Sequence, residues 1–308
     1  MGLNLRVSII VPSYQQAEFL PRTLDSLVLQ QGVPLEIIIQ DGGSTDDSVK
    51  TIQEYAQKYP NLIRWESKKD GGQSAGINMG LKKATGDIIG YLNSDDLLYP
   101  DALKNVTHYF DQHSEAMLVY GIGDHIDEEG AYLGVYPTEK WSYPHLLETC
   151  FICQPACFWR REVMERHGFF DESLHYSMDY EYWLRVGQKE KFHYLPLKLA
   201  ASRCHIQAKR FEAEAAVRAE AVQVVFRYNR GKASLSWLAG LAKVRAAKWL
   251  NSVCPTCGVF GFCLSYWKNL FALLPKMNTP SLLLLLQKLI PPLKSVFGRK
   301  KDPFFYLK

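Results

Sequence analysis

The chain has 308 residues, of which 47% are hydrophobic and 22% charged, as in an ordinary globular protein, and this composition argues against disorder. Its charge is uneven: residues 1–212 hold 21 Lys/Arg against 29 Asp/Glu, whereas residues 213–308 hold 15 against 3. The acidic first part argues against a nucleic-acid groove, and the basic second part, rich in Leu, Trp and Phe, favours contact with an anionic membrane surface.

The first hundred residues alternate predicted strands and helices. Apolar runs predict strands over residues 6–14, 35–47, 61–67 and 86–93, and apolar residues at helical spacing predict helices over 18–32 and 44–59, the second capped by Ser44 or Thr45. A glycine-rich link over residues 69–76 precedes the last of these strands. This order predicts an α/β fold with a mostly parallel sheet and helices on both faces.

The pattern changes after residue 115. We expect a strand over 116–123, a hairpin over 125–136 that turns at Glu129-Gly130, a strand over 155–161, a short helix ending at Gly168 and a helix over 178–188. Strands over 191–205 are predicted at a sheet edge, because Pro196 lacks the N–H that a central strand needs.

From about residue 209 the chain is predicted to be helical. Residues 249–267 carry no charge and are just long enough to span a bilayer, but Asn251 and Pro255 weaken that interpretation. We favour helices that lie in the membrane interface, and the alternative is a helical appendage packed on the rest of the chain or on a partner. We therefore divide the chain into domains over residues 1–212 and 213–308.

The cysteines and the N-terminus point to a reducing compartment. The seven cysteines lack the regular spacing of a disulfide framework, and Cys254 and Cys257 form a lone C-x-x-C without a second pair at zinc spacing. The first residues show no signal-peptide cleavage site, and Arg6 stands where a myristoylation signal has Ser or Thr. We expect a cytoplasmic protein.

Polar clusters follow three of the predicted parallel strands: Ser13-Tyr14, Asp41-Gly42-Gly43 and Asn93-Ser94-Asp95-Asp96. Ligands bind beyond the carboxyl ends of such strands, so we expect these clusters to line one crevice. Neither a dinucleotide-binding G-x-G-x-x-G nor a P-loop is present in the sequence. Carboxylates at a strand end suit Mg²⁺ or Mn²⁺ with a bound phosphate, although Asp96 could instead cap a helix that begins near Pro100.

Four segments together resemble the family 2 inverting glycosyltransferases of the GT-A fold, over roughly residues 6–210: "VSIIVPSYQQAEFLPRTLDSL", "EIIIQDGGSTDDSV", "GGQSAGINMGLKKATGDIIGYLNSDDLL" and "GFFDESLHYSMDYEYWLRV". The resemblance implies a Rossmann-like, mostly parallel sheet with an antiparallel acceptor-side part. It also implies transfer of a sugar, with inversion, from a nucleotide-diphosphate donor.

The resemblance assigns donor-binding residues. Pro12 and Tyr14 would pack around the base with Glu18 nearby, and Asp41 would accept a hydrogen bond from the base, usually uracil. The loop from Asp70 to Gly72 would lie beside the nucleoside and phosphates.

The resemblance also assigns a metal site to the segment "NSDD". Asp95 stands at the last position of the family's D-x-D element and Ser94 at its middle, so Asp95 would bind Mn²⁺ or Mg²⁺, while Asn93 replaces the first acid. His205 would supply the ligand that Asn93 does not. Arg203, together with Lys209 and Arg210, would face the phosphates.

Asp179 is the predicted catalytic base, which takes the proton of the acceptor hydroxyl. Met178 stands where family members often have Glu. Glu181 is a second candidate, but its spacing from Arg185 favours an ion pair along the helix, and Asp179 itself could merely cap that helix. Gln154 lies in a segment that resembles one near the acceptor, and it could equally be a buried structural residue.

The sequence therefore predicts an inverting, metal-dependent glycosyltransferase at the inner face of a membrane. It would act on a nucleotide-diphospho-sugar, a UDP-sugar by preference, and on a glycan or lipid-linked acceptor in polysaccharide or glycolipid synthesis. The alternatives are a nucleotidyltransferase, which should carry a glycine-rich basic loop after the first strand, and a non-catalytic sugar-binding scaffold.

Overall fold

The structure is a computed structural model and describes residues 5–205, 214–234, 237–243, 265–266, 268–269 and 272. Its strands form one mixed sheet in the order β3-β2-β1-β4-β8-β6-β9-β5, with β7 paired to β6. The strands are β1 (Val7–Ser13), β2 (Leu35–Asp41), β3 (Ile63–Ser67), β4 (Ile88–Tyr91), β5 (Leu97–Leu98), β6 (Leu118–Ile126), β7 (Tyr132–Val135), β8 (Cys157–Arg160) and β9 (Phe192–Arg203).

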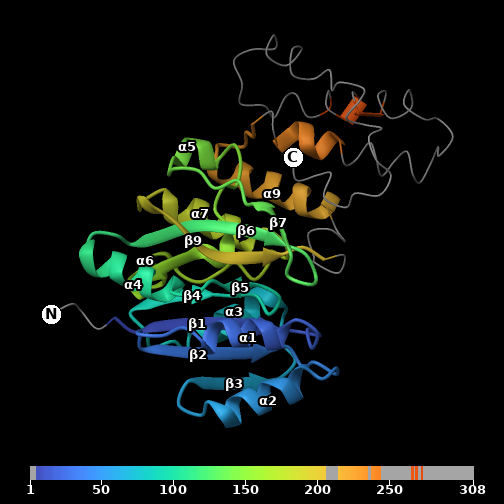
Figure 1. The fold of residues 1–308 in the computed structure, drawn as a ribbon. Coiled ribbons are helices and arrows are strands. Elements are labelled where there is room, and N and C mark those ends of the chain that lie inside the picture. Colours follow the sequence, from blue (N-terminus) through green and yellow to red (C-terminus); the bar gives the residue numbers. More distant parts are fainter. Residues whose placement is uncertain are drawn as a thin grey trace.

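The predicted parallel half and antiparallel half are both confirmed. Strands β3, β2, β1 and β4 pair in parallel, and β8 then runs antiparallel to both β4 and β6. The expected hairpin is formed by β6 and β7, and Gly130 adopts a positive φ of 94° in its turn. Figure 1 shows β1, β2 and β3 stacked toward one end of the molecule.

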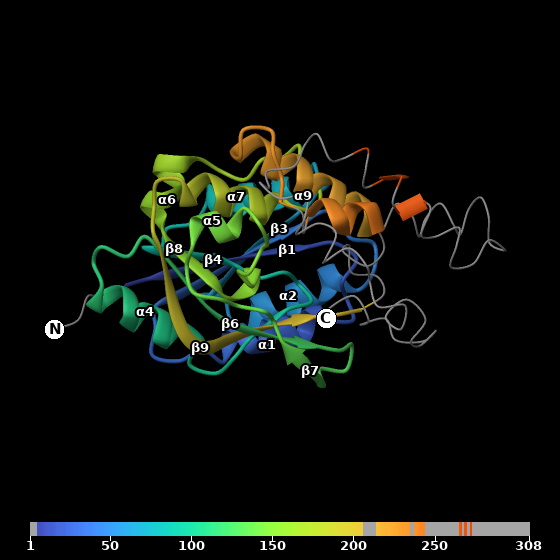
Figure 2. The ribbon, with the colours of Figure 1, turned by 90° about the horizontal axis from the view of Figure 1, so that it is seen from above.

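Helices cover both faces of the sheet. They are α1 (Leu20–Val28), α2 (Ser48–Lys58), α3 (Gln73–Leu81), α4 (Ala102–Gln112), α5 (Tyr143–Leu146), the 3₁₀ turn η1 (Gln154–Ala156), α6 (Arg161–His167), α7 (Met178–Gly187) and α9 (Glu214–Tyr228). Apolar residues of α1, α2 and α4 belong to one core cluster, and those of α3, α6, α7 and α9 to another. Seen from above, α6, α7 and α9 lie on one side and α1, α2 and α4 on the other (Figure 2).

Helix α3 approaches the sheet closely. A Cβ placed on Gly80 would lie 2.5 Å from Cγ2 of Ile10, so only glycine lets α3 pack this near to β1. The close packing brings the N-terminus of α3, at Gln73, to the carboxyl ends of the parallel strands.

One local expectation holds in part and one is wrong. Strand β9 lies at the sheet edge where Pro196 falls, because it pairs there with β6 alone, and the two-residue β5 covers its other side only at Ala200 and Ala201. Pro196 is accommodated because the register with β6 shifts between Tyr120 and Ile122, which leaves it outside the regular ladder. Helix α2 begins at Ser48 after Asp47, so neither Ser44 nor Thr45 is its cap.

The described part of the predicted tail packs onto the same core. Val224 and Val225 of α9, together with Leu238, are fully buried within the cluster that also holds α7. Figure 1 shows α9 beside α7. The division at residue 212 stays a prediction, as do the properties of residues 249–267, which lie almost wholly outside the described residues.

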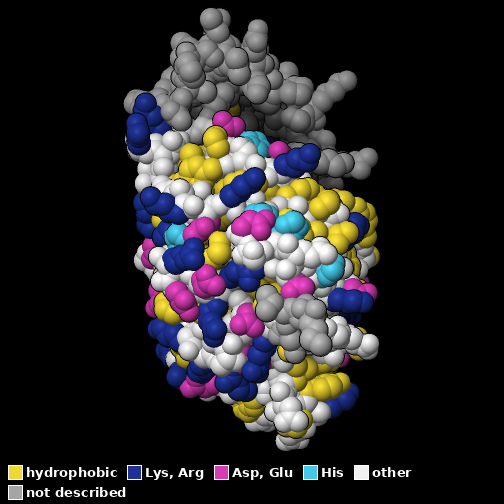
Figure 3. All heavy atoms as spheres, turned by 90° about the vertical axis from the view of Figure 1, so that its left-hand side faces the viewer, with side chains coloured by type: hydrophobic (Ala, Val, Ile, Leu, Met, Phe, Trp, Pro, Cys, Tyr) yellow, Lys and Arg dark blue, Asp and Glu magenta, His cyan; other side chains and the backbone are white. Residues whose placement is uncertain are grey.

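The described cysteines form no disulfide bond: Cys150, Cys153, Cys157 and Cys204 all carry thiols. Cys254 and Cys257 lie outside the described residues. Acidic and basic side chains are interspersed on the face shown in Figure 3. Among the described residues, no helix combines the length and the apolar character needed to cross a bilayer.

Candidate active site

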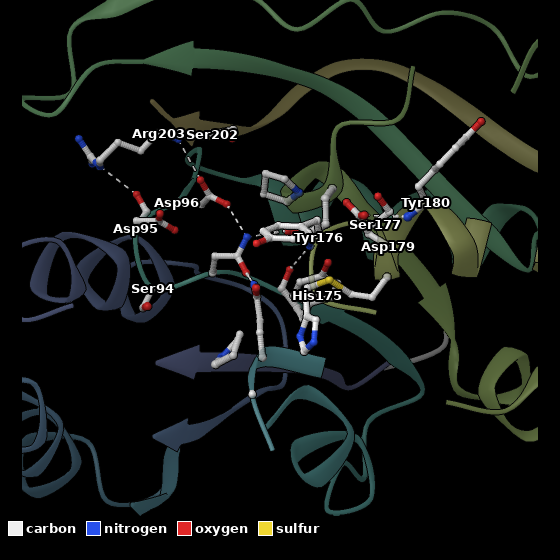
Figure 4. A pocket seen from close by; sticks show the side chains of 18 of the residues that line it. Ser94, Asp95, Asp96, His175, Tyr176, Ser177, Asp179, Tyr180, Ser202 and Arg203 are labelled. Atoms are coloured by element: carbon white, nitrogen blue, oxygen red, sulfur yellow. Dashed lines mark hydrogen bonds between the residues drawn. The ribbon is translucent and has the colours of Figure 1, made fainter. Parts of the chain in front are cut away.

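A cavity of about 680 Å³ lies at the carboxyl ends of the parallel strands, and it collects most of the predicted site residues. Among the candidates that line it are Pro12, Tyr14, Asp70, Gly72, Asn93, Ser94, Asp95, Asp179, Arg203 and His205. Figure 4 shows Ser94, Asp95, Asp96 and Arg203 on one side of this cavity and Ser177, Asp179 and Tyr180 on the other. The cavity thus has two acidic sides that come from distant parts of the chain.

Asp95 lies in a tight turn directly after β4, where the Asp96 N–H donates to the Asn93 carbonyl at 3.1 Å. Its Oδ2 is 3.0 Å from Nε2 of His205, which follows the end of β9. The His205 ring is buried and lies 4.7 Å, centroid to centroid, from that of Phe19. Pairing of β5 with β9 brings these two segments together, although Asp95 and His205 are 110 residues apart.

The neighbours of Asp95 have structural hydrogen bonds. Asp96 accepts from the backbone N–H of Arg203 at 2.9 Å and from Nδ2 of Asn93 at 3.1 Å. It does not cap α4, whose N-cap is Asp101. Asn93 also donates to Oε1 of Gln154 at 3.1 Å, and its own Oδ1 accepts from Nε2 of Gln73 at 2.7 Å. The Oδ1 atom that Asn93 could offer to a metal therefore already accepts one hydrogen bond, from Gln73.

Arg203 is buried and connects the loops around the Asp95 turn. Its Nε donates to the Asp95 carbonyl at 2.9 Å, and its Nη1 to the carbonyls of Asp127 and Glu128, each at 2.8 Å. Its Nη2 is buried without a hydrogen-bond partner among the described residues. Burial, with the nearby charge of Arg22, lowers the pKa of Arg203. Lys209 and Arg210 lie outside the described residues.

Asp41 and Glu18 are the two predicted donor residues absent from the lining of the cavity. Asp41 is 2% exposed, and its carboxylate accepts from the backbone N–H groups of Gly43 and Ser44 and from the hydroxyls of Ser44 and Ser67, at 2.6–3.0 Å. These bonds hold the loop that carries Gly42, which does line the cavity. Contact between Asp41 and a base stays a prediction.

Gly42 lies between two predicted donor residues. A Cβ at Gly42 would lie 3.3 Å from the ring of Tyr14 and 3.4 Å from the carboxylate of Asp70. Tyr14 is 62% exposed, so its ring is free to pack on a flat ligand. Asp70 accepts from the Gly72 N–H at 2.8 Å, and Gly72 has a φ of 106° at the start of α3. The geometry forms an open slot between Tyr14 and Asp70.

Asp179 lies in the first turn of α7, on the other side of the cavity from Asp95. Burial raises the pKa of its carboxyl group to about 6, and the negative charge of Glu220 adds to this, whereas the N–H of Tyr180 opposes it. Its Oδ1 accepts from that N–H at 2.7 Å. A carboxylate with this pKa can take up a proton near neutral pH.

Glu181 has the structural role that its spacing predicted. It is 2% exposed, pairs with Arg185 at 2.9 Å and accepts from the Tyr228 hydroxyl. It does not appear among the residues that line the cavity. Gln154, by contrast, does line the cavity, and its Nε2 donates to the Tyr91 carbonyl at 2.8 Å.

Several lining residues were not anticipated from the sequence. Val217 and Ala221 of α9 and Trp237 close part of the cavity, and Gln73 of α3 holds Asn93. The apolar spacing of residues 217–225 signalled a buried helix face, but nothing in the sequence indicated which surface that face covers.

The donor groups around Asp95 suit a divalent cation that keeps other ligands. Among the described residues, no three His, Cys, Asp or Glu side chains converge as a complete metal cluster. Asp95 and His205 nevertheless offer a carboxylate and an imidazole in hydrogen-bond contact. Mg²⁺ and Mn²⁺ are commonly held by one or two protein ligands with phosphate oxygens and waters, so these residues fit such an ion.

Comparison with known proteins decides the family. The family model for glycosyl transferase family 2 matches residues 8–215, more than half of the chain. The chain belongs to glycosyl transferase family 2. This glycosyltransferase is 29% identical to chondroitin synthase of Escherichia coli over 195 residues, which cover 61% of its chain and 27% of the relative. It is also 29% identical to an uncharacterized glycosyltransferase of Rickettsia typhi over 214 residues, 65% of its chain and 64% of the relative.

Solved structures show that the glycosyltransferase has the GT-A fold. S. aureus TarS residues 1–349 in complex with UDP-GlcNAc superpose with a TM-score of 0.58 at 15% identity, covering 86% of this chain and 79% of the other. A mannosyltransferase of Pyrobaculum calidifontis in complex with GDP-Man and Mn²⁺ gives a TM-score of 0.57 at 20% identity, covering 92% and 79%. The predicted family and fold are therefore confirmed.

Proposed function

We propose that this glycosyltransferase transfers a sugar, with inversion, from a nucleoside diphosphate donor to a hydroxyl group of a glycan or lipid-linked acceptor. The observation that carries the proposal is the placement of Asp95 with His205 on one side of a single cavity and Asp179 on the other. An inverting displacement needs both features at once: stabilisation of a departing diphosphate and a base for the incoming hydroxyl.

The donor would bind between the slot at Tyr14 and the turn at Asp95. The exposed Tyr14 ring would pack on the base, and Asp70 and Ser94 would lie beside the ribose and phosphates. A UDP-sugar is the preferred donor because Asp41, at the end of β2, matches the family's uracil-binding acid. TarS binds UDP-GlcNAc and the Pyrobaculum enzyme binds GDP-Man, which supports a nucleotide-sugar without selecting the base.

Asp95 and His205 would hold a divalent cation, which when bound neutralises the charge that develops on the diphosphate. Nε2 of His205 lies 3.0 Å from Oδ2 of Asp95, so the two proposed ligands lie side by side at the cavity. Arg203 would fix the turn from behind, through its bonds to the Asp95 carbonyl and to Asp96.

Asp179 would remove the proton of the acceptor hydroxyl as that oxygen attacks the sugar. Burial raises the pKa of Asp179 to about 6, so this carboxyl group is ionised in most molecules at neutral pH. It is nevertheless a stronger base than an ordinary aspartate. Asp179 lines the cavity on the side opposite the Asp95 turn, which supports its role as the base in an in-line displacement.

We expect Asp179→Asn to lower kcat by about 100- to 10,000-fold, the usual contribution of a general base. The assay measures sugar transfer to glycan acceptors, after nucleotide-sugars have been screened for thermal stabilisation of the protein with Mn²⁺. Donor-dependent stabilisation should persist in the variant, because Asp179 lies on the acceptor side. Addition of EDTA should abolish the wild-type turnover. Turnover that survives Asp179→Asn in a folded protein contradicts the assignment of the base.

A non-catalytic sugar-binding scaffold is the remaining alternative. Such a protein would be stabilised by a nucleotide-sugar and would neither transfer nor hydrolyse it. A nucleotidyltransferase is disfavoured, because the segment after β1 lacks a glycine-rich basic loop and the chain belongs to glycosyl transferase family 2.

The pathway and location are part of the same proposal. The curated relatives include chondroitin and hyaluronan synthases, which supports a role in polysaccharide or glycolipid synthesis. We place the protein in the cytoplasm, bound peripherally to the inner face of the membrane through the basic, apolar residues 213–308. The charge of that segment supports the location.

A further inference from the structure

Glu220, near the middle of α9, binds the segment that leads into α7. Its Oε1 accepts from the backbone N–H of His175 at 3.0 Å, and its Oε2 accepts from those of Tyr176 and Ser177, each at 2.7 Å. Ser177 is the N-cap of α7 but makes no capping bond with its own side chain. A carboxylate from a different helix therefore accepts from three consecutive backbone N–H groups that lead up to and include the N-cap of α7, and its negative charge lies near the positive end of that helix dipole.

The segment that Glu220 holds forms one side of the cavity. His175, Tyr176, Ser177, Met178 and Asp179 all line it. Asp179 comes two residues after Ser177, in the first turn of α7. The bonds to Glu220 thus fix the backbone from which the Asp179 carboxylate extends.

Glu220 also acts on Asp179 through its charge. Among the described residues, four titratable groups interact electrostatically with Asp179: Glu220 from α9, Tyr91 from β4, and Cys150 and Cys157 on either side of η1. Burial raises the pKa of Cys150 to about 12 and those of Tyr91 and Cys157 well above their ordinary values, so these three are neutral near pH 7. Of the four, Glu220 carries the charge.

We propose that Glu220 is a positioning residue for sugar transfer: its carboxylate, from beyond the predicted domain boundary, holds the 175–177 segment and with it the base Asp179 at the cavity. This inference rests on the proposed function of Asp179. If Glu220 has this role, α9 completes the site of sugar transfer. Residues 1–212 alone would then lack the contact that holds the acceptor side of the cavity in place.

Two other bonds join α9 to the same region and supply a control. Arg227 pairs with Asp171 at 2.8 Å, and the Tyr228 hydroxyl donates to Glu181. Arg227 is about half exposed and does not line the cavity. Arg227→Met therefore loosens α9 without touching the 175–177 segment or the charge beside Asp179.

The decisive experiment measures the pH dependence of transfer by the full-length Glu220→Gln variant. Glutamine has one acceptor oxygen and no charge. It therefore cannot accept from all the backbone N–H groups that the two carboxylate oxygens of Glu220 bind. We expect kcat to fall about 10- to 100-fold, as misplaced catalytic groups do, with the donor KM within about twofold of wild type. We also expect the acid limb of kcat/KM to move to lower pH, since removing a nearby negative charge lowers the pKa of Asp179.

Two further variants separate positioning from charge and from general loosening. Glu220→Asp keeps the negative charge but has a side chain shorter by one methylene group, so kcat should fall while the acid limb of kcat/KM stays near its wild-type pH. This variant also tests the proposal if Glu220→Gln does not fold. Arg227→Met should leave both quantities near wild type. The proposal is overturned if a folded Glu220→Gln keeps the wild-type kcat and pH profile, or if Arg227→Met reproduces its effects.

A readout without turnover keeps this proposal distinct from the proposed function. The carboxyl carbon of Asp179, followed by ¹³C NMR in wild type and Glu220→Gln, reports its titration directly. An inactive wild type whose Asp179 titrates at lower pH in the variant refutes the transfer function but supports the contact with Glu220. An active wild type with an identical titration in the variant refutes the effect of the Glu220 charge on Asp179, and an unchanged kcat beside it refutes the positioning role as well.

Discussion

At the scale of single residues, neighbours in the sequence have separate roles. Asp95 faces the cavity and contacts His205, whereas the adjacent Asp96 accepts from the Arg203 backbone and from Asn93 and is 3% exposed. Asn93, which replaces the first acid of the D-x-D element, is used to connect Gln73, Asp96 and Gln154. The turn therefore pairs Asp95 with a histidine at the cavity and uses Asp96 and Asn93 to hold its shape.

The raised pKa of Asp179 makes a prediction about stability. Its carboxyl titrates at about 6 in the folded protein against an ordinary value of 3.8, so the folded state binds this proton more tightly. The free energy of unfolding therefore falls as the pH rises from 3.8 to 6. Above pH 6 it stays lower by the full amount that ionisation of Asp179 removes. Asp179→Asn should be more stable than wild type at pH 7.5, by on the order of 1–2 kcal/mol after allowance for its partial exposure to solvent.

Urea unfolding at pH 7.5 and pH 4 measures this difference. The gain should be present at pH 7.5 and nearly absent at pH 4, where most of the Asp179 carboxyl groups of the folded protein are already protonated. An equal gain at both pH values, or a loss at pH 7.5, contradicts a raised pKa at this position. Activity lost together with stability gained is the pattern expected of a residue kept for function.

At the scale of elements, the site depends on helices and strands that come from both ends of the described chain. Strand β9 reaches the Asp95 turn through β5 and carries Arg203 and His205 there. Helix α9 packs against α7 and contributes Val217 and Ala221 to the cavity. The residues that line the cavity thus extend past residue 212. They include part of the segment that the charge distribution had suggested to be a separate domain.

A chain that ends at residue 212 should fail to fold cooperatively. It lacks Val222, Val224, Val225, Leu238 and Leu241, which are at most 3% exposed. Each such side chain contributes about 1.5–3 kcal/mol by burial, so together they match the 5–15 kcal/mol by which domains are typically stable. Differential scanning calorimetry of this chain should show no cooperative transition, while full-length Gln223→Ala, at an exposed position of α9, should keep the wild-type Tm. A wild-type Tm in the shortened chain would contradict the prediction.

At the scale of the whole molecule, the charges form two populations. Residues 1–212 carry an excess of acids and residues 213–308 an excess of bases, yet the face in Figure 3 shows both signs interspersed. The basic excess is therefore a property of the C-terminal third of the sequence, most of which lies outside the described residues. Its partner is proposed from composition alone.

The full-length protein should float with vesicles that contain anionic lipid and should remain in the pellet fraction with neutral vesicles. Binding should weaken between about 50 and 500 mM salt, because mobile ions screen charges over a shorter distance as their concentration rises. Flotation that is equal for both vesicle types and insensitive to salt would contradict an electrostatic attachment. The full chain is used, because shortening it at residue 212 removes part of the core.

The sequence by itself determined the family, the mostly parallel half of the sheet and the segments that meet at its carboxyl edge. These features depend on local patterns: apolar runs that form strands, and acids placed directly after them. The tertiary structure decided that Asp95 contacts His205 while Asp96 binds the Arg203 backbone, placed Pro196 in a strand paired with β6 and brought Glu220 to the start of α7. Each of these follows from contacts between residues far apart in the chain, such as the bond between Arg203 and Asp95 across 108 positions. Local periodicity carries no information about such pairs, because they form only when the strands and helices pack.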